Sequence, residues 1–568
     1  MSLDKPGQSH FGEELEPRPA RIMPLAKKVR YTVRIPLMPI IGAPDFGFVV
    51  GYMSRKTSTD ITLVLNAHDE TKYLQRTVAS LEESVRHAKS FGLKFELAIV
   101  LDQPVPSTEE WLRKQEFNAF DQVVTVKCDH GSLGLARNEG ISAATGEYIA
   151  TCDADDLISF NMFSTLYATA KRSGPKAIVI PQYLLAFGQE KFLVEYYGTD
   201  CVSRLGFLTY HPSVSRIFAH RSIFDLSKYV DVGPNSDYAF EDWHFACESI
   251  AKGCDFVIGR GTILFYRRRS NSLGRVADRT SVQQIPPTAL FAPKKFLSCC
   301  ARDFVRFKSG EINSKDPKII TQEFTGNPLV EELIRAASKL DPAINTRSHS
   351  SLPAYSNLAP PLVGGATYYR ICELIERRQF TDVVFAPSYV GGGGNYLLDL
   401  IEGIIRLERG RKFLILFTGG SQVDSAAPEQ SDDLAIIDLT KAEYKCAESD
   451  LQIIALRVLE NFAPGGTIHV GTSNFSFGFI EKFYSVLKSY KLIFYRPNEI
   501  RTECESAEPA AGEVFNFISE FGENFSFIVA ADESTLQHDT TLLNTLANRY
   551  IVAPALCRGI ASYIDRIS

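Results

Sequence analysis

Three carboxylates crowd four residues of the chain: Asp153, Asp155 and Asp156 in the segment CDADD. Carboxylates this close repel one another, so a fold keeps them in open solvent or over a cation. Alternate residues of an extended chain point to the same side, which puts Asp153 and Asp155 on one side. Carboxylate oxygens suit Mg²⁺ or Mn²⁺, which also accept phosphate oxygens. The spacing predicts either a divalent metal site on Asp153 and Asp155 or a solvated acidic turn.

The residues before this cluster predict how the fold positions it. Residues 136–144 have helical spacing, and Gly146 is expected to end that helix. Residues 148–152, YIATC, are short, apolar and β-prone, which favours a buried strand. The acids then follow the carboxyl end of a strand, where open α/β sheets bind their ligands.

A regular alternation of strands and helices surrounds this segment from Asp60 onward. Further strands are expected at 61–65, 95–101 and 123–127, with helices at 73–91 and 109–117. This order predicts an α/β fold with a mostly parallel sheet covered on both faces. Polar residues at the strand ends, namely Glu70, Asp102 and Asp153, should converge at one sheet edge.

The run ARNEGISAATGEYIATCDADD, residues 136–156, resembles the nucleotide-sugar site of the family 2 glycosyltransferases, which have the GT-A fold. The resemblance implies that Asp153 and Asp155 bind the metal, with Asp153 also at the donor. It places Arg137 near the donor diphosphate, whereas an ordinary role for Arg137 would be a salt bridge on the helix surface.

Two more strand ends resemble the same family. VLNAHDE, residues 64–70, is similar to its first strand, and IVLDQP, residues 99–104, to its second. In the family these positions hold the base and the ribose, which implies that Asn66, Glu70 and Asp102 bind the donor. Gln103 and Pro104 depart from the family pattern.

Residues 240–245, FEDWHF, form a second informative stretch. Two acids at a helix start are favoured by the helix dipole alone. The stretch also resembles the family's "EDwdf" motif, in which the Asp is the general base and the aromatic residue belongs to the acceptor site. The resemblance implies that Asp242 is the base and that Glu241 and Trp243 bind the acceptor, with Trp243 as a platform for a sugar face.

Residues 263–273, ILFYRRRSNSL, resemble the family's closing "yYR.h..S" element, so the resemblance covers about residues 60–275. Some members have a metal-binding His where this chain has Arg269, so no third protein ligand is expected. The arginines here, Arg267 included, are instead expected to neutralise the diphosphate.

A second α/β pattern follows a helical connector. Strands are expected at 382–386, 413–417, 435–438, 467–470, 491–494 and 527–530, and a four-glycine run, Gly391–Gly394, precedes a helix. The order resembles the N-terminal Rossmann-like half of GT-B glycosyltransferases of the family 4 type. The donor-binding half would begin after residue 568. We expect either a fragment of a longer protein or a non-catalytic remnant, with the activity in the first module.

These patterns predict four regions: an N-terminal extension at 1–57, a GT-A domain at 58–278, a helical connector and linker at 279–375, and a Rossmann-like domain at 376–568. Basic residues between Lys27 and Arg34 indicate either a strand near anionic lipid or a solvated edge strand.

Charge and cysteine usage narrow the class of protein. A net charge of −6 gives no reason to expect nucleic-acid binding, and eleven cysteines without a CxxC pair favour reduced thiols. No apolar run is long enough to span a bilayer. We expect a cytoplasmic protein. Peripheral contact with the inner face of the membrane is the alternative that these observations leave.

Three functions remain for the chain. The first is an inverting, metal-dependent glycosyltransferase that moves a sugar from a nucleotide-sugar to a glycan or lipid-linked glycan; the resemblance implies bacterial surface polysaccharide synthesis. The second is a non-catalytic scaffold or glycan-binding module of a polysaccharide-assembly complex. The third is a nucleotidyltransferase or other phosphoryl enzyme, against which the EDW element and its distance from the acidic strand argue.

Overall fold

A computed structural model describes residues 59–233, 235–270, 281–311, 314–345, 352–358, 361–375, 378–387, 394–408, 410–418, 431–441, 445–498, 509, 511–553 and 563–564. The predictions for residues 1–57, for Gly391–Gly393 and for the chain end after residue 564 lie outside the described residues. Lys56–Ser568 form one compact unit, which contains both sheets described below.

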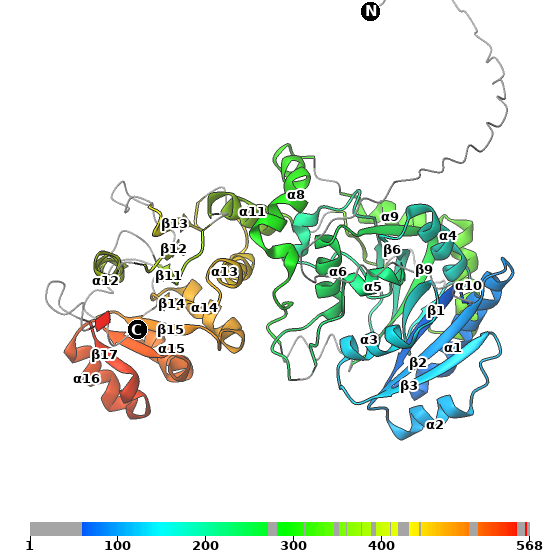
Figure 1. The fold of residues 1–568 in the computed structure, drawn as a ribbon, viewed down its shortest axis with the longest axis horizontal. Helices are drawn as coiled ribbons and strands as arrows, with labels where there is room; N and C mark the ends of the chain where they lie inside the picture. Colours follow the sequence, from blue (N-terminus) through cyan, green and yellow to red (C-terminus); the bar gives the residue numbers. More distant parts are fainter. Residues whose placement is uncertain are drawn as a thin grey trace, which may run out of the picture. The chain divides into compact units, whose positions relative to one another are not determined.

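The first sheet has ten strands, and Figure 1 shows it with the helices that cover it. The acidic cluster follows the carboxyl end of one of its central strands. Its strands β1 (Ile61–Ala67), β2 (Phe95–Asp102), β3 (Gln122–Cys128) and β4 (Tyr148–Asp153) are parallel, in the order β4-β1-β2-β3. Every residue of β1 is buried, as expected for a parallel strand covered on both faces. The predicted parallel α/β architecture is confirmed.

The same sheet continues with strands of mixed direction. β8 (Phe218–His220) pairs antiparallel with β4 and with the long strand β6 (Ala177–Gly188). β6 runs parallel to β9 (Asp255–Arg268) along its whole length, with an irregularity between Pro181 and Tyr183. The short strands β5 (Leu157–Ile158) and β7 (Leu193–Glu195) pair with β9 and β6. Beyond β4 the sheet is therefore no longer a simple parallel one.

Helices cover this sheet and set the loops of its edge. They are α1 (Thr71–Lys89), α2 (Pro106–Lys114), α3 (Leu133–Ala143), α4 (Met162–Ser173), α5 (Ser222–Leu226) and α6 (Glu241–Ala251). α1 buries Leu74, Leu81 and Val85 against the strands, the spacing of one helix face. Gly146 does not end α3, which stops at Ala143. A Cβ at Gly146 would lie 2.6 Å from Thr62 N, so this glycine allows the chain to pass close to β1.

The described residues of the predicted connector include the helices α8 (Pro293–Lys308), α9 (Pro317–Thr325) and α10 (Pro328–Leu340). Each begins with proline, which suits a first turn where the N–H has no helical partner. The predicted linker differs from expectation. Residues Ala354–Ser356 form β10, which extends the first sheet through β7, and α11 begins at Val363 and ends at Ile375.

Close packing explains the glycine pair at the start of α11. A Cβ at Gly365 would lie 2.1 Å from the carbonyl oxygen of Leu205, in the 3-10 helix η1 (Arg204–Leu208). The pair therefore lets α11 approach η1, whereas the sequence suggested a flexible linker.

The second sheet has seven parallel strands in the order β13-β12-β11-β14-β15-β16-β17. Their bounds are β11 Asp382–Ala386, β12 Phe413–Phe417, β13 Leu434–Asp438, β14 Thr467–Val470, β15 Lys491–Arg496, β16 Phe527–Ala530 and β17 Tyr550–Val552. The helices between them are α12 (Gly394–Leu407), α13 (Glu448–Phe462), α14 (Asn474–Phe483), α15 (Ala511–Phe521) and α16 (Glu533–Leu542). The order reverses between β11 and β14, as in doubly wound sheets. The six predicted strands are present, and the GT-B relationship stays a prediction.

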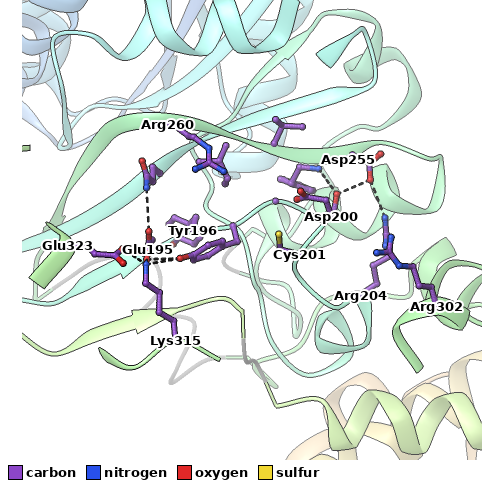
Figure 2. A pocket seen from close by; sticks show the side chains of 17 residues that line it. Glu195, Tyr196, Asp200, Cys201, Arg204, Asp255, Arg260, Arg302, Lys315 and Glu323 are labelled. Atoms are coloured by element: carbon purple, nitrogen blue, oxygen red, sulfur yellow. Dashed lines mark hydrogen bonds and ion pairs between the residues drawn. The ribbon is translucent and has the colours of Figure 1, made fainter. Parts of the chain in front are cut away.

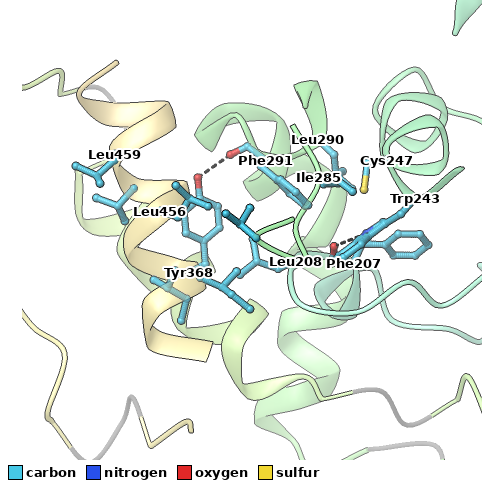
Figure 3. Packing of buried hydrophobic residues seen from close by; sticks show 14 of the residues in the cluster. Phe207, Leu208, Trp243, Cys247, Ile285, Leu290, Phe291, Tyr368, Leu456 and Leu459 are labelled. Atoms are coloured by element: carbon cyan, nitrogen blue, oxygen red, sulfur yellow. Dashed lines mark hydrogen bonds between the residues drawn. The ribbon is translucent and has the colours of Figure 1, made fainter. Parts of the chain in front are cut away.

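α13 of the second domain packs directly against the first. Leu456 and Leu459 lie in one hydrophobic cluster with Phe207, Trp243 and Phe291 (Figure 3). The buried Tyr368 of α11 joins the same cluster and donates a hydrogen bond to the carbonyl oxygen of Phe291. The two sheets therefore share part of one core.

A buried arginine adds polar contacts to this interface. Arg457 Nη1 lies 3.1 Å from Ile285 O and 2.8 Å from Glu460 Oε2, and Nη2 lies 2.9 Å from Gln284 Oε1. Within the described ranges, no helix combines the length and apolar character needed to cross a membrane.

Candidate active site

Arg137 joins the acidic strand end to the predicted catalytic helix. Its side chain is fully buried, with Nη1 2.6 Å from Glu241 Oε1 and Nη2 3.3 Å from Asp153 Oδ1. The guanidinium also lies over the ring of Tyr229. Residues from β4, α3 and α6 thus meet at the carboxyl edge of the sheet.

Arg216 is a second cation at this edge, which the sequence analysis missed. It contacts Asp153 and lies 2.5 Å from Asp156. Burial disfavours the charged form of Asp153, but Arg216 and Arg137 outweigh burial and hold its pKa below the usual range. The sequence signal for Arg216 is its place just before β8, which becomes meaningful only once β8 is known to pair with β4.

Arg269 brings Asp155 and Glu70 together. Its Nε lies 2.9 Å from Asp155 Oδ2, and Nη2 lies 3.3 Å from Glu70 Oε1. Burial, followed by the charge of Asp156, raises the pKa of Asp155 to about 7, although Arg269 opposes the shift. The position where some family members have a histidine is therefore occupied by a cation that pairs with the acidic cluster.

Asn66 lies in the middle of this edge with an unsatisfied side chain. It is opposite Asp153 in the pairing of β1 with β4, and both polar atoms of its amide are buried without a hydrogen-bond partner among the described residues. Buried amides are normally paired, so an unsatisfied one needs an explanation. A ligand at the sheet edge would supply the missing partner, in line with the predicted role in donor binding.

Asp102 and Arg267 are engaged with the protein instead of facing open space. The Asp102 carboxylate accepts hydrogen bonds from the backbone N–H groups of His130, Gly131 and Ser132, and so holds the loop that leads into α3. Arg267 is buried, where it donates to Asp155 O at 2.9 Å and pairs with Asp341 at 2.6 Å. The structure thus favours positioning roles for two residues that the sequence analysis assigned to the donor.

Asp242 lies in the first turn of α6, where the helix dipole favours an anion. The preceding Phe240 has a positive φ of 64°, which turns the chain sharply into the helix. Asp242 Oδ1 accepts the N–H of Trp243, and Oδ2 lies 3.8 Å from His211 Nδ1. The Asp242 side chain is 21% exposed, so solvent and a substrate can reach this carboxylate.

Trp243 does not offer the open ring face that the sequence analysis expected. Only 4% of the residue is exposed, and its Nε1 donates a hydrogen bond to Phe207 O at 3.0 Å (Figure 3). It lies on the side of α6 that packs on η1, with His211 stacked beside it. Tyr210, 40% exposed, is the more accessible aromatic residue of this neighbourhood.

The net charge of the side chains around Asp153 and Asp155 indicates whether a divalent cation would fit there. Five carboxylates meet three guanidinium groups here, which leaves two negative charges when all five carboxylates are ionised; the groups are Glu70, Asp153, Asp155, Asp156, Glu241, Arg137, Arg216 and Arg269. The excess charge and the oxygen ligands fit one divalent ion. The described residues contain no group of three or more His, Cys, Asp or Glu arranged as a metal site. An ion on Asp153 and Asp155 would therefore need ligand oxygens to complete its coordination.

Residues 62–223 match the model of the family "Glycosyl transferase family 2". Glycosyltransferase GlyG of Streptococcus pneumoniae serotype 4 is 34% identical over 76 residues, which are 13% of this chain and 25% of that protein. The chain thus matches a quarter of the length of this curated relative.

Two solved structures of S. aureus TarS are weakly similar. TarS 1-349 in complex with UDP-GlcNAc matches with a TM-score of 0.31 and 12% identity, over 56% of this chain and 87% of that one. A second TarS structure matches with a TM-score of 0.29 and 15% identity, over 59% of this chain and 57% of that one. Scores this low carry no argument about the active site. The family match at residues 62–223 includes the acidic cluster at the end of β4.

Proposed function

We propose that the protein is an inverting glycosyltransferase that moves a sugar from a nucleotide-sugar donor to a glycan or lipid-linked glycan. One observation carries the proposal. Inside or beside a family 2 domain, Arg137 holds the acidic end of β4 against the N-terminus of the helix that begins Glu241-Asp242. A donor-binding edge and a candidate base thus lie within one cluster of side chains.

The donor would occupy the carboxyl edge of the first sheet. Asn66 has unsatisfied amide atoms there, and Glu70 lies beside Arg269. Guanidinium groups bind phosphate oxygens well. Arg216 and Arg269 would therefore neutralise the diphosphate, once they exchange their ion pairs with the aspartates for contacts with phosphate oxygens. These contacts would orient the anomeric carbon toward α6.

Asp242 would act as the general base. Its carboxylate takes the proton from the acceptor hydroxyl while the hydroxyl oxygen attacks the anomeric carbon. The bond between that carbon and the diphosphate oxygen breaks in the same step, so the configuration inverts and a nucleoside diphosphate leaves. A divalent ion bound by Asp153 and Asp155 would supply a Lewis acid for that leaving group.

Product analysis tests this function. The purified chain is incubated with a panel of nucleotide sugars, Mn²⁺ and candidate glycan acceptors, and the released nucleotide is identified. A glycosyltransferase releases a nucleoside diphosphate. A parallel incubation with nucleoside triphosphates and sugar phosphates tests the rival reaction, and release of pyrophosphate there, without nucleoside diphosphate release from any nucleotide sugar, would show a nucleotidyltransferase and overturn the proposal.

A scaffold without turnover is the second candidate, because Asp153 and Asp155 are engaged by arginines in the structure. Calorimetry separates the two. An enzyme of the proposed kind binds its nucleotide-sugar more tightly when Mn²⁺ is present, while a scaffold shows no metal-dependent binding of any donor.

A further inference from the structure

A cavity of about 680 Å³ lies apart from the acidic edge, between the first half of β9 and the segment after β7 (Figure 2). None of the acids discussed above lines it. Its volume is in the range of sites that enclose a drug-sized ligand, about 300–1,000 Å³. Its lining is rich in charged side chains, which an ordinary apolar pocket lacks.

One end of the cavity is built around Lys315. Its Nζ lies 2.7 Å from Glu195 Oε2, 3.0 Å from Tyr197 Oη and 2.5 Å from Glu323 Oε2. Glu195 also accepts a hydrogen bond from Tyr197, and its side chain is buried. These contacts hold donors, acceptors and an aromatic ring in fixed places, so a ligand would lose little free energy to ordering them.

The opposite end carries a second set of ion-paired groups. Arg204 Nη2 lies 3.2 Å from Asp255 Oδ1, which also accepts a hydrogen bond from Thr199. Asp255 remains 61% exposed, so it can accept further hydrogen bonds from a ligand. The backbone between the two ends is tightly packed, since a Cβ at Gly198 would lie 2.6 Å from Phe256 O.

Two arginines face the cavity without an acidic partner. In the part of the chain that the structure describes, neither Arg260 nor Arg302 makes an ion pair, and both are exposed. Figure 2 shows Arg260 between the two ends, with no dashed line to a neighbour. Their guanidinium groups are therefore free to donate to a ligand.

The charges of the lining cancel. Four lysine or arginine side chains and four carboxylates line the cavity, so it does not select for a charged ligand. A sugar hydroxyl donates one hydrogen bond and accepts others, which matches a wall that presents guanidinium donors beside carboxylate acceptors. The rings of Tyr196 and Tyr197 add apolar faces of the kind that pack on sugar rings.

We propose that this cavity binds a neutral oligosaccharide, the distal part of the acceptor glycan whose growing end lies at Asp242. The assignment of the glycan as acceptor rests on the proposed function, whereas the cavity's affinity for a neutral glycan does not.

Tyr196 lines the cavity and belongs to the same hydrophobic cluster as Trp243, the residue after the candidate base. This tyrosine is 8% exposed, and burial raises its pKa, with smaller contributions from Tyr210, Tyr266 and the charge of Asp242. β9 also runs from the cavity to the acidic edge, because its first residues line the cavity and the backbone N–H of Arg267, near its end, donates a hydrogen bond to Asp156. The proposed glycan would extend along this strand.

The test is a glycan array that displays neutral, carboxylated and phosphorylated oligosaccharides, probed with the full chain without donor. The wild type should retain neutral oligosaccharides. The double variant Arg260→Ala, Arg302→Ala should bind the neutral oligosaccharides at least tenfold more weakly than the wild type. Arg113→Ala, which removes an exposed arginine of α2 outside the cavity, should bind as the wild type does. Both cavity arginines are exposed, so their loss should leave thermal unfolding unchanged.

Retention of anionic glycans alone, no retention of any glycan, or equal binding by the double variant would overturn the proposal. The fate of the proposed function is read separately. Asp242→Asn should bind the array as the wild type does but should lose transfer activity. If the wild type releases no nucleoside diphosphate from any donor, the transferase function is wrong, whereas the proposed glycan site is not affected by that result.

Discussion

Arg137 donates a hydrogen bond of 2.6 Å to Glu241, a residue 104 positions later in the chain. The contact is buried and its other partner is Asp153, so one guanidinium links the end of β4 to the start of α6. This relationship brings the edge proposed for the donor and the candidate base into one cluster of side chains.

Replacing Arg137 with alanine should therefore damage stability and activity together. Removing one partner of a buried ion pair leaves uncompensated charge and costs about 3–5 kcal/mol. Thermal or urea unfolding would measure the loss, and the transfer rate should fall even at temperatures where the variant is folded. Arg113→Ala removes an exposed arginine and should change neither. A folded Arg137→Ala enzyme with wild-type turnover would show that the contacts of Arg137 with Asp153 and Glu241 are not needed for catalysis.

Metal removal should abolish transfer. The acidic cluster carries two more carboxylates than guanidinium groups, a charge that one divalent ion would balance. Dialysis against EDTA should eliminate activity, and Mn²⁺ or Mg²⁺ should restore it. Asp155→Asn should raise the metal concentration needed for half-maximal activity by tenfold or more. Full activity in EDTA would instead mean that the arginines alone neutralise the diphosphate.

Arg457 should couple the second domain to the active site. It is fully buried and holds Gln284 and Ile285, while Gln284 O accepts the N–H of Ala239, two residues before Glu241. Arg457→Ala should cost about 3 kcal/mol or more of unfolding free energy and lower the transfer rate.

The matched control for Arg457 is Lys488, whose pair with Asp237 crosses the same interface but is 74% and 36% exposed. Exposed pairs contribute about 0–1 kcal/mol, so Lys488→Ala should have little effect on unfolding. Similar losses for both variants would contradict the importance assigned to the buried arginine.

The second sheet should be most sensitive to acid at Asp382. Burial disfavours the charged carboxylate, but hydrogen bonds from His469 and Arg411 outweigh burial and lower its pKa. Because the folded pKa is below the unfolded value of about 3.9, this carboxylate stabilises the fold above that pH, and its contribution falls as pH drops below it. Asp382→Asn should thus destabilise the protein at pH 7, and the difference in unfolding temperature from the wild type should shrink toward about pH 3. A constant difference over this range would contradict the ion-pair explanation.

Much of this arrangement could be predicted from the sequence because parallel strands leave a clear pattern. Buried runs such as 61–65 and 148–152 mark strands, and polar residues that follow them must meet at one edge. Asp153, Glu70 and Arg137 were placed at that edge on this basis and on the family resemblance. Asn66 was added by resemblance, and its unsatisfied amide supports the assignment.

The rest depends on contacts that no local pattern encodes. Arg216 matters only because β8 pairs antiparallel with β4, and a strand expected near residues 215–219 does not by itself indicate which strand it pairs with. Trp243 is buried because α6 packs one side on η1, which the motif alone does not indicate. Gly365 belongs to a helix because of its close approach to Leu205, while its sequence is typical of a linker.

The most direct measurement of the central claim is the transfer rate of Asp242→Asn. A general base contributes about 10²–10⁴-fold, so transfer should fall by at least 100-fold while nucleotide-sugar binding, measured by calorimetry, stays unchanged. Asp225→Asn, an exposed aspartate of α5, is the control and should transfer sugar normally. Transfer by Asp242→Asn at the wild-type rate would contradict the account, because another group would then have to accept the proton.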